Sequence, residues 1–574
     1  FYIQYQRGIL MKNISKYIPV TLMWALPLLL IVPNVILDVT EQYYSIAARI
    51  ANVALPLGVY LLLASWSRHV GRTALFMIPV MVLCAFQIVL LYLYGESIIA
   101  IDMFLNVVTT NYHEASELLG NLGVAIAVVC LLYLPPVVAG IVLCVKKRYT
   151  GKPERRRAFR AGLVSAGVGL VAFAAAFLMP HGYNPLRELF PVNVGYNMGM
   201  AAYRTALTKE YKASSADFRF KAHADMDSVP PVIVLVIGET SRADNWQLNG
   251  YGRETNPRLS ERENLIFFSR VLSESNTTHK SVPLLMSHLS ARHFGDSIYN
   301  VKSVISAFGE AGYRTAWISN QQHNGSLIDF FGEEADCVRF LTDDGLHHHD
   351  MEICGALGHI VSENTEKPLF AVLHTYGSHF NYTERYPAEY SRFKPDGDMQ
   401  AKRENRRQLI NAYDNTILYI DAMLDSIAEV LECSGRPAAM LYLTDHGEDI
   451  FDDARERFLH ASPTPTYWQL HVPMILWLSD GYAAEHPDRL ASAREYAGSE
   501  VSSSRSAFHT LMSLGGISSP FYDVSAALTE EGYREPSRLY VNDYNEGVPL
   551  TRAGLRKPDF EKLASAGFSV GSAR

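Results

Sequence analysis

The stretch VIVLVIGET, residues 232–240, decides the fold of the larger part of the chain. Its apolar residues follow one another without polar alternation, which is typical of a strand buried on both faces of a parallel sheet. Three further runs share this character: FAVLHTYG (370–377), AMLYLTDHG (439–447) and VPMILWLS (472–479). Because helical segments separate these short runs, the pattern from residue 230 onward predicts an α/β sandwich around a mostly parallel sheet.

Side chains that bind metals follow two of these strands. Glu239 comes directly after the first strand, and Asp445 and His446 end another. Open α/β sheets bind ligands at the carboxyl ends of their strands, so these groups are expected at one edge. Together with His379 in HTYGSHF and His460 in FLHAS, they form an oxygen and imidazole set that suits zinc. Each residue alone is more often structural, so the prediction rests on the combination.

Candidate hydroxyl nucleophiles lie between the first two strands, in SNTTHKSVPLLMS at residues 275–287. This segment offers Thr277, Thr278 and Ser281 just before an expected helix, whose N-terminal amides favour a phosphate. Zinc lowers the pKa of an alcohol and positions its oxygen for attack on phosphorus. The same composition also suits an ordinary helix cap, and the residues alone leave the three hydroxyls open.

The first third of the chain carries five apolar runs of membrane-spanning length. Each is near the ~20 residues that a transmembrane helix needs. Their ranges are 17–37, 45–66, 74–95, 121–145 and 159–180. We therefore expect three parts: a five-helix transmembrane domain (1–180), a linker with helical content (181–229) and a soluble α/β domain (230–574).

Lys and Arg cluster in alternate connections between these runs. They precede the first run and occupy the second and fourth connections, whereas residues 38–44 and 96–120 contain none. Cationic connections stay in the cytoplasm, so everything after about residue 181 is expected outside it. Apolar residues spaced along 96–120 predict an amphipathic helix on the outer membrane face.

Composition disfavours several classes of protein. A net charge of −8 and a pI near 6.2 give no basic surface of the kind that nucleic-acid binding needs. A transporter would carry ionisable residues within its spans, and the five runs contain few. The six cysteines form no CxxC pair. Cys337 and Cys354 can form one disulfide and leave Cys433 single, although three free thiols are equally consistent with the sequence.

Several motifs occur in the order and spacing of one enzyme family. They are GETSRADNWQLNGYGRETNP (238–257), TTHKSVP (277–283), HTYGSH (374–379), DHGE (445–448), LH (459–460) and HVPMILWLS (471–479). With these motifs the chain resembles the phosphoethanolamine transferases of lipid A, core sugars and colistin resistance. The resemblance spans nearly the whole chain. It implies a bacterial inner-membrane protein with five helices and a periplasmic catalytic domain of the alkaline phosphatase or sulfatase type.

The resemblance implies a zinc centre with a threonine nucleophile. The family's zinc ligands match four residues: Glu239, Thr278, Asp445 and His446. Thr278 stands five residues before Pro283, as the family nucleophile stands before its proline, and Thr277 is the fallback. One tight zinc site is implied, with a second zinc during turnover as a further option.

The resemblance also implies substrate contacts. His379 and His460 match histidines that bind the transferred phosphate or a second zinc, and one of them is expected to assist proton transfer. His374 matches a motif histidine, which we group with substrate binding. In the surface helix, the family's contacts to the donor headgroup match Asn106, Thr110 and Glu114.

The implied reaction moves phosphoethanolamine from phosphatidylethanolamine to a lipid-linked acceptor, lipid A or lipopolysaccharide core, in a protein expected to be a monomer. The acceptor is the open point, because Glu274 and Leu284 stand where the lipid A branch has a disulfide beside its nucleophile. WISNQQHNG (317–325) is closer to the core-sugar branch. Lys280 is a candidate for a lysine that some relatives use near the phosphate, and HHHD (347–350) is expected to be a solvated loop.

A phosphoglycerol transferase of the same fold is the alternative reading. The headgroup that is consumed, rather than any residue pattern, separates it from a phosphoethanolamine transferase. A sulfatase is disfavoured because the sequence contains no CxPxR segment to supply the modified nucleophile of that class.

Overall fold

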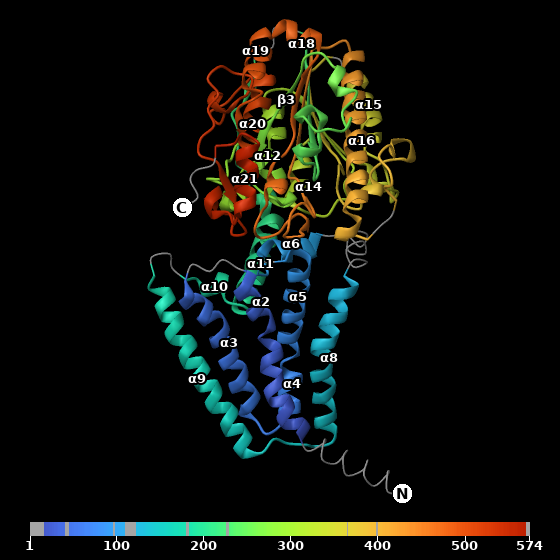
Figure 1. Cartoon of the computed structure of the whole chain (residues 1–574). Coiled ribbons are helices and arrows are strands. Elements are labelled where there is room, and N and C mark those ends of the chain that lie inside the picture. The colour runs from blue at the N-terminus through green and yellow to red at the C-terminus, as the bar shows by residue number, and fades with distance from the viewer. Residues whose placement is uncertain are drawn as a thin grey trace. The chain divides into compact units, whose positions relative to one another are not determined.

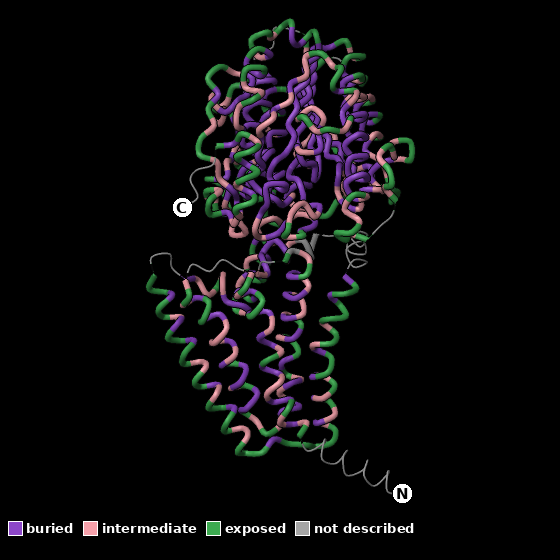
Figure 2. Tube along the Cα trace, in the orientation of Figure 1, coloured by how far each residue is buried: buried purple, intermediate pink, exposed green. Residues whose placement is uncertain are grey.

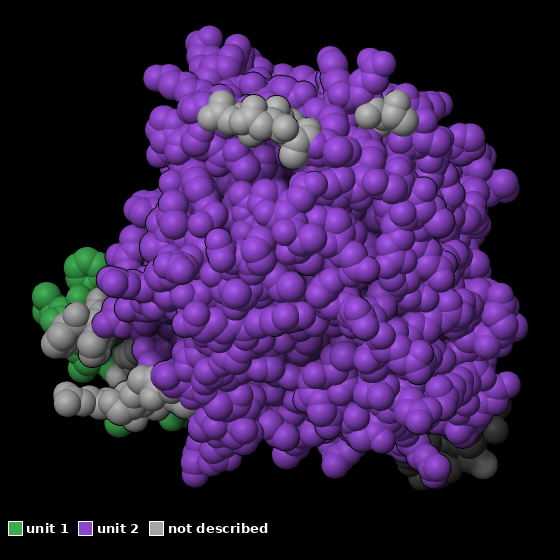
Figure 3. Space-filling view, turned by 90° about the horizontal axis from the view of Figure 1, so that it is seen from above, with its two compact units in different colours: residues 1–104, 110–202 green, residues 105–109, 203–574 purple. Residues whose placement is uncertain are grey.

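The computed structural model describes residues 17–40, 45–95, 98–109, 122–179, 183–224, 229–363, 366–397 and 400–569. The chain divides into two compact units, which Figure 3 distinguishes by colour. One unit comprises residues 1–104 and 110–202, and the other comprises residues 105–109 and 203–574. The boundary falls within α11 (Val192–Ser214), which follows the short α10 (Pro185–Glu188) in the expected linker.

The first unit is built from apolar helices (Figure 1). Four helices in the described part of this unit are long and apolar enough to cross a membrane. The first is Tyr17–Thr40, whose last part is α2 (Val32–Thr40). The others are α3 (Ile46–Trp66), α8 (Gly123–Val145) and α9 (Lys152–Phe177). A pair, α4 (Val70–Phe76) and α5 (Ile78–Tyr94), is apolar enough jointly but is bent by 52°. The expected helical membrane part is confirmed, with a fifth span when the bent pair counts as one.

The bend between α4 and α5 has a cause in the sequence. Met77 separates the two helices, and Pro79 lies in the first turn of α5. A proline is tolerated there because the first N–H groups of a helix have no partner within the helix. The single span expected over residues 74–95 is therefore a bent pair that begins at Val70.

The second unit contains a seven-stranded sheet in the order β3, β11, β8, β2, β7, β5, β6. In that order the strands are Leu265–Phe268, Met474–Leu478, Ala438–Thr444, Val232–Gly238, Leu369–His374, Arg314–Ser319 and Cys337–Phe340. β2 is parallel to β7 and β8, and β5 is parallel to β7 and β6, whereas β11 is antiparallel to β8 and β3. The predicted mostly parallel sheet is confirmed, and the four predicted strands are β2, β7, β8 and β11.

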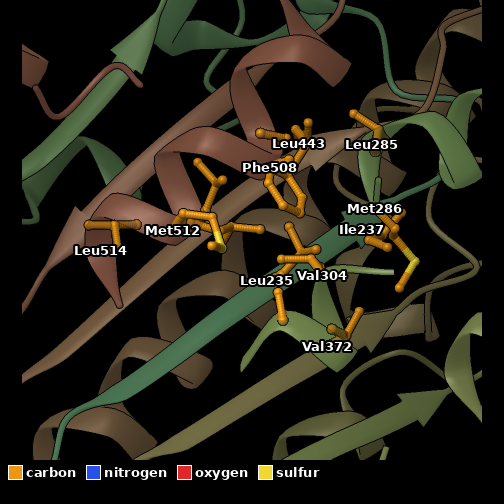
Figure 4. Close-up of a cluster of buried hydrophobic side chains, with 14 of the residues drawn as sticks. Leu235, Ile237, Leu285, Met286, Val304, Val372, Leu443, Phe508, Met512 and Leu514 are labelled. Carbon is orange, nitrogen blue, oxygen red and sulfur yellow. The ribbon is translucent and has the colours of Figure 1, made fainter. Parts of the chain in front are cut away.

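Helices cover both faces of this sheet (Figure 1). Leu235 and Ile237 of β2 belong to one core, and Val234 and Val236 belong to the other. The first core includes side chains from α12 (Thr278–Leu285), α13 (Val304–Glu310) and α20 (Ser503–Leu514), part of which Figure 4 shows. The second core includes side chains from α15 (Glu352–Glu363) and α16 (Arg406–Cys433). The strands form the buried centre of the unit (Figure 2), which explains their lack of polar alternation.

Shorter elements complete the second unit. Two-stranded pairs are formed by β1 (His223–Ala224) with β13 (Ile517–Ser518), β9 (Asp449–Ile450) with β10 (Phe458–Leu459), β4 (Arg270–Leu272) with β12 (Glu500–Ser502), and β14 (Leu539–Val541) with β15 (Gly547–Pro549). The remaining α-helices are α14 (Leu327–Gly332), α17 (Tyr467–Leu470), α18 (Asp480–Glu485), α19 (Pro487–Tyr496) and α21 (Lys557–Ser565). All of these elements lie outside the main sheet.

Candidate metal centre and nucleophile

Two neighbouring strands, β2 and β8, deliver predicted zinc ligands to one edge of the sheet, and β7 ends beside them. Gly238 of β2 pairs with Thr444 of β8, and Ile237 of β2 pairs with His374 of β7. The residues that follow these positions leave the sheet side by side. Glu239 follows β2 and Asp445 follows β8, so the rule that ligands gather at the carboxyl ends of strands holds for this pair.

The nucleophile candidate lies at the start of a helix outside the sheet. Thr278 is the first residue of α12, and Thr277 is its N-cap. The last turn of α12 is anchored in the core by Leu284 and Leu285, which are 0% and 1% exposed. A short helix fixed at its far end holds its first residue in place at the edge of the sheet.

Thr278 meets the acidic and imidazole groups directly. Its Oγ1 lies 3.1 Å from His446 Nε2 and 3.3 Å from Glu239 Oε1. His446 Nε2 in turn lies 3.1 Å from Asp445 Oδ2 and 3.7 Å from Glu239 Oε1. The structure thus brings the four predicted zinc ligands together from three separate parts of the chain.

Hydrogen bonds orient both carboxylates. Asp445 Oδ1 accepts the backbone N–H of Thr240 at 3.2 Å and that of His446 at 2.7 Å. Glu239 Oε1 accepts the Thr240 hydroxyl at 2.7 Å, and Glu239 Oε2 accepts Gln321 Nε2 at 3.3 Å. Asp445 Oδ2 is buried and has no hydrogen-bond partner. A buried carboxylate oxygen left in this way fits a bound cation.

Charge in this cluster also favours a metal ion. Burial raises the pKa of Glu239 to about 7, and the neighbouring Asp445 carboxylate adds to that rise. Burial raises the pKa of Asp445 to about 7 and lowers the pKa of His446. Two carboxylates and a neutral imidazole in a dry site lack positive charge. Nitrogen and oxygen ligands of these kinds suit zinc, so the residues present fit the predicted metal.

Two further histidines flank the cluster. The ring of His460 lies 4.3 Å from that of His446 and 5.5 Å from that of His379, between ring centroids. Ligand atoms of Glu239, His446 and His460 all lie within 4.8 Å of one another. His379 Nδ1 contacts the backbone oxygen of Phe380 at 2.7 Å, which requires a proton on Nδ1 and leaves Nε2 as an acceptor. His460 therefore lies within the ligand cluster, and His379 lies beside it next to His460.

His374 has different surroundings. It ends β7, where its Nδ1 lies 3.2 Å from Ser319 Oγ and its ring lies 5.2 Å from that of Trp317. Burial lowers the pKa of His374 to about 3. These contacts place a neutral ring in the interior at the start of the HTYGSH segment, and its role in substrate binding stays a prediction.

The predicted contacts to the donor headgroup fall largely beyond what the structure describes. Asn106 lies in α6 (Ile101–Thr109), but its side chain is not among the described ones. Thr110 and Glu114 lie outside the described residues altogether. The expected surface helix over 96–120 is therefore seen only as α6, and the three contacts stay predictions.

Sequence reasoning missed Asp350. The HHHD segment was expected to be a solvated loop, and His347 is indeed exposed, but Asp350 is only 4% exposed. Its carboxylate accepts the backbone N–H groups of Tyr376 at 2.9 Å and Gly377 at 2.8 Å. Asp350 thus orders the loop that carries His379, and nothing in its local sequence pattern signals this long-range role.

Gly377 of the same loop is required by its conformation. Its φ is +58°, and a Cβ atom at this position would lie 2.6 Å from the backbone oxygen of Glu239. Gln321 is a second residue that the sequence did not single out, because it donates to Glu239 and, at 2.9 Å, to the backbone oxygen of Thr375. Gln321 therefore links Glu239 to the HTYGSH segment through its side-chain amide.

The cysteines and Glu274, which the sequence also singled out, lie away from the ligand cluster or make structural contacts. All six cysteines are free, so Cys337 and Cys354 form no disulfide. Glu274, at the position of a family disulfide, is buried and accepts hydrogen bonds from the Ser504 hydroxyl and the backbone N–H of Arg505. A carboxyl group therefore fastens the segment before the nucleophile to the start of α20.

Comparison with known proteins agrees with this geometry. Residues 231–517, half of the chain, match the Sulfatase family model, which defines the class of the α/β domain. The chain is 30% identical over 412 residues to Phosphatidylethanolamine transferase Mcr-1 of Escherichia coli, covering 65% of this chain and 73% of that protein. The chain belongs to the phosphoethanolamine transferase family within the sulfatase class.

Two further relatives agree. Phosphoethanolamine transferase EptA of Escherichia coli (strain K12) is 30% identical over 302 residues, covering 51% of this chain. That match spans 54% of EptA, so the chain spans about half the length of this curated relative. The solved integral membrane protein EptA of Neisseria meningitidis covers 87% of this chain and 97% of its own, with a TM-score of 0.66 at 21% identity, which confirms the fold class.

Proposed function

We propose that this chain transfers phosphoethanolamine from phosphatidylethanolamine to a lipid-linked acceptor through Thr278 at a single tight zinc site. The observation that supports the proposal most strongly is the position of Thr278 Oγ1, 3.1 Å from His446 and 3.3 Å from Glu239. A hydroxyl among these ligand types is placed to act both as a ligand and as a nucleophile.

The surroundings of the two threonines favour Thr278 over Thr277. Thr277 is buried, and its hydroxyl lies 3.2 Å from that of Ser275. Thr278 is half-buried and faces Glu239 and His446. Only the Thr278 hydroxyl is thus both near the ligand cluster and open to a substrate.

The first half of the proposed reaction loads the enzyme. Thr278 Oγ1 forms a bond to phosphorus, the bond between phosphorus and the glycerol oxygen breaks, and diacylglycerol leaves with a proton. Zinc, when bound by Glu239, Thr278, Asp445 and His446, lowers the pKa of the hydroxyl and neutralises charge on the phosphoryl oxygens. Loading leaves phosphoethanolamine esterified to Thr278.

The second half discharges the enzyme. An acceptor oxygen bonds to phosphorus, the ester bond to Thr278 breaks, and the Thr278 oxygen takes back a proton. We assign the proton transfer to His379, because its Nδ1–H is held by the Phe380 carbonyl and Nε2 remains as the acceptor. Burial holds the pKa of His460 well below its ordinary value, so this ring suits binding of phosphate or metal better than proton transfer.

The membrane part supports a proposal for the location and for the class of acceptor. Apolar helices of spanning length indicate an inner-membrane protein, and the distribution of Lys and Arg supports a periplasmic catalytic domain. Donor and acceptor are then amphiphiles in the same bilayer. We propose lipid A or lipopolysaccharide core as the acceptor and the monomer as the working form.

The test is intact mass and peptide mapping of the zinc-loaded full chain in detergent after incubation with phosphatidylethanolamine. We expect a phosphoethanolamine adduct on Thr278 that is absent from Thr278→Ala and retained in Thr277→Ala. An adduct formed only with phosphatidylglycerol would replace the proposal with phosphoglycerol transfer. Absence of any adduct with either lipid would refute the covalent mechanism.

A further inference from the structure

A pocket of about 260 Å³ lies within the second unit, beside the start of α12. Its walls come from α11, from the 3-10 turn Gly295–Asn300 with the preceding Phe294, and from the start of α14. Its volume is near the lower end of small-molecule sites, which run from roughly 300 Å³ upward. It can hold a headgroup or a sugar phosphate but not a whole lipid.

The side chains of this pocket combine positive charge with apolar surface. Arg204, Lys209 and Lys280 line it, and none of the described lining residues is Asp or Glu. The apolar part includes Phe294 and Ile328. Guanidinium and ammonium groups favour phosphate, and apolar walls favour the hydrocarbon next to it. This chemistry matches an anionic group on an apolar body.

Two of the cations are fixed in place. Arg204 Nη2 donates to the backbone oxygen of Asp543 at 2.9 Å, and Lys280 Nζ donates to that of Asn542 at 2.9 Å. Both residues are only 2% exposed. These two contacts fix the positions of both side chains at the pocket wall before a ligand arrives.

The pocket and the metal centre share the first turn of α12. Thr278 faces Glu239 and His446, whereas the next two residues, His279 and Lys280, line the pocket. Successive helical residues are rotated by about 100°, so one turn presents different residues to two sides. A ligand held in the pocket is therefore adjacent to the nucleophile but outside its ligand cluster.

We propose that this pocket is a second substrate subsite, which binds a phosphate ester on an acylated body and presents it beside Thr278. The inference rests on the proposed function and extends it. The phosphate has two sources with the same chemistry, the glycerophosphate of the donor and the phosphate of an acylated sugar acceptor. In the first case Thr278 attacks the donor that the pocket holds. In the second case the acceptor that the pocket holds takes phosphoethanolamine from Thr278.

A binding experiment tests the pocket without requiring turnover. Dodecyl phosphate is titrated into the full-length Thr278→Ala protein in neutral detergent, with dodecanol as the uncharged comparison. The exposed Lys209 is reversed in Lys209→Glu, and the matched control is Lys212→Glu on the same helix, where Lys212 pairs with Glu333 outside the pocket. We expect Lys209→Glu to weaken binding of dodecyl phosphate by tenfold or more relative to the control, roughly the value of one charge-assisted contact. Equal affinities in the two variants would overturn the proposal.

Kinetics then distinguish the donor from the acceptor as the source of the phosphate. For this experiment the Lys209→Glu and Lys212→Glu variants are made in a protein that keeps Thr278. Loading is followed as the adduct that forms with phosphatidylethanolamine, and discharge is followed as its loss after lipid A is added. A defect of Lys209→Glu in loading alone assigns the pocket to the donor, and a defect in discharge alone assigns it to the acceptor. If the wild type forms no adduct, the proposed function fails, while the binding result still decides the pocket.

Discussion

Lowering the pH from 8 to 6 is expected to weaken zinc binding about a hundredfold. Glu239 and Asp445 each have a pKa of about 7 in the metal-free protein, raised first by burial. Metal ligation requires both carboxylates to be ionised. With a pKa near 7, each is about nine-tenths ionised at pH 8 and about one-tenth ionised at pH 6. Two tenfold losses multiply to about a hundredfold, or about 2.7 kcal/mol.

The direction of this pH effect depends on which protonation state of the two carboxyl groups the protein favours. Because their pKa values are raised, the two carboxyl groups hold protons that zinc must displace, so the affinity for zinc falls as the pH falls through 7. His446 adds less to this effect than an ordinary histidine would, because burial lowers its pKa and so disfavours the protonated ring. The pH dependence should therefore correspond to two protons and level off above pH 8.

The assay is competition for zinc between the full chain in detergent and a chromophoric chelator that is calibrated at each pH. Asp445→Asn is the informative variant, because it removes one titrating group and also the charge that helps raise the pKa of Glu239. Its affinity should be lower at every pH but should change by at most tenfold between pH 8 and 6. A wild-type affinity that is equal at the two pH values would refute the assignment of both carboxylates as ligands.

Three further predictions concern the support of this site. Gly377→Ala should lose zinc, measured as metal content, because its Cβ would lie 2.6 Å from the backbone oxygen of Glu239. Asp350→Asn should lower stability by about 1–3 kcal/mol in thermal unfolding, because it removes a buried charged acceptor for two loop N–H groups. Burial raises the pKa of Glu274 to about 8, above its unfolded value, so its contribution to stability is complete in acid and is lost as the pH rises from about 4.5 to 8. The free energy of unfolding should therefore fall less over this range in Glu274→Gln than in wild type.

The main strands were predictable because their apolar composition indicates that they are buried. β2, β7, β8 and β11 are continuous apolar runs, and such runs suit a sheet covered by helices on both faces. β5 and β6 were not singled out, because RTAWIS and CVRF mix charged or small residues with apolar ones. The edge strand β6 keeps exposed side chains, so its sequence resembles that of a loop as much as that of a strand.

The candidate site was predictable only as far as strand ends could place it. Glu239 and Asp445 follow adjacent parallel strands, so a general rule brings them together. The choice of Thr278 over Thr277 depends on how the first turn of α12 faces the sheet, and sequence alone leaves that open. Asp350 and Gln321 form hydrogen bonds to residues that are distant in the sequence, and no local sequence pattern predicts these bonds.

The carboxylates of this centre are arranged for binding a metal rather than for folding without one. Burial and repulsion from Asp445 raise the pKa of Glu239, and Asp445 Oδ2 has no hydrogen-bond partner. Keeping such groups ionised and buried costs free energy that hydrogen bonds from Thr240 and Gln321 offset only in part. A divalent cation removes the repulsion and gives the remaining oxygen a partner. The loop that Asp350 and Gly377 order therefore helps to hold the proposed ligands in an arrangement that costs free energy and that a bound cation would stabilise.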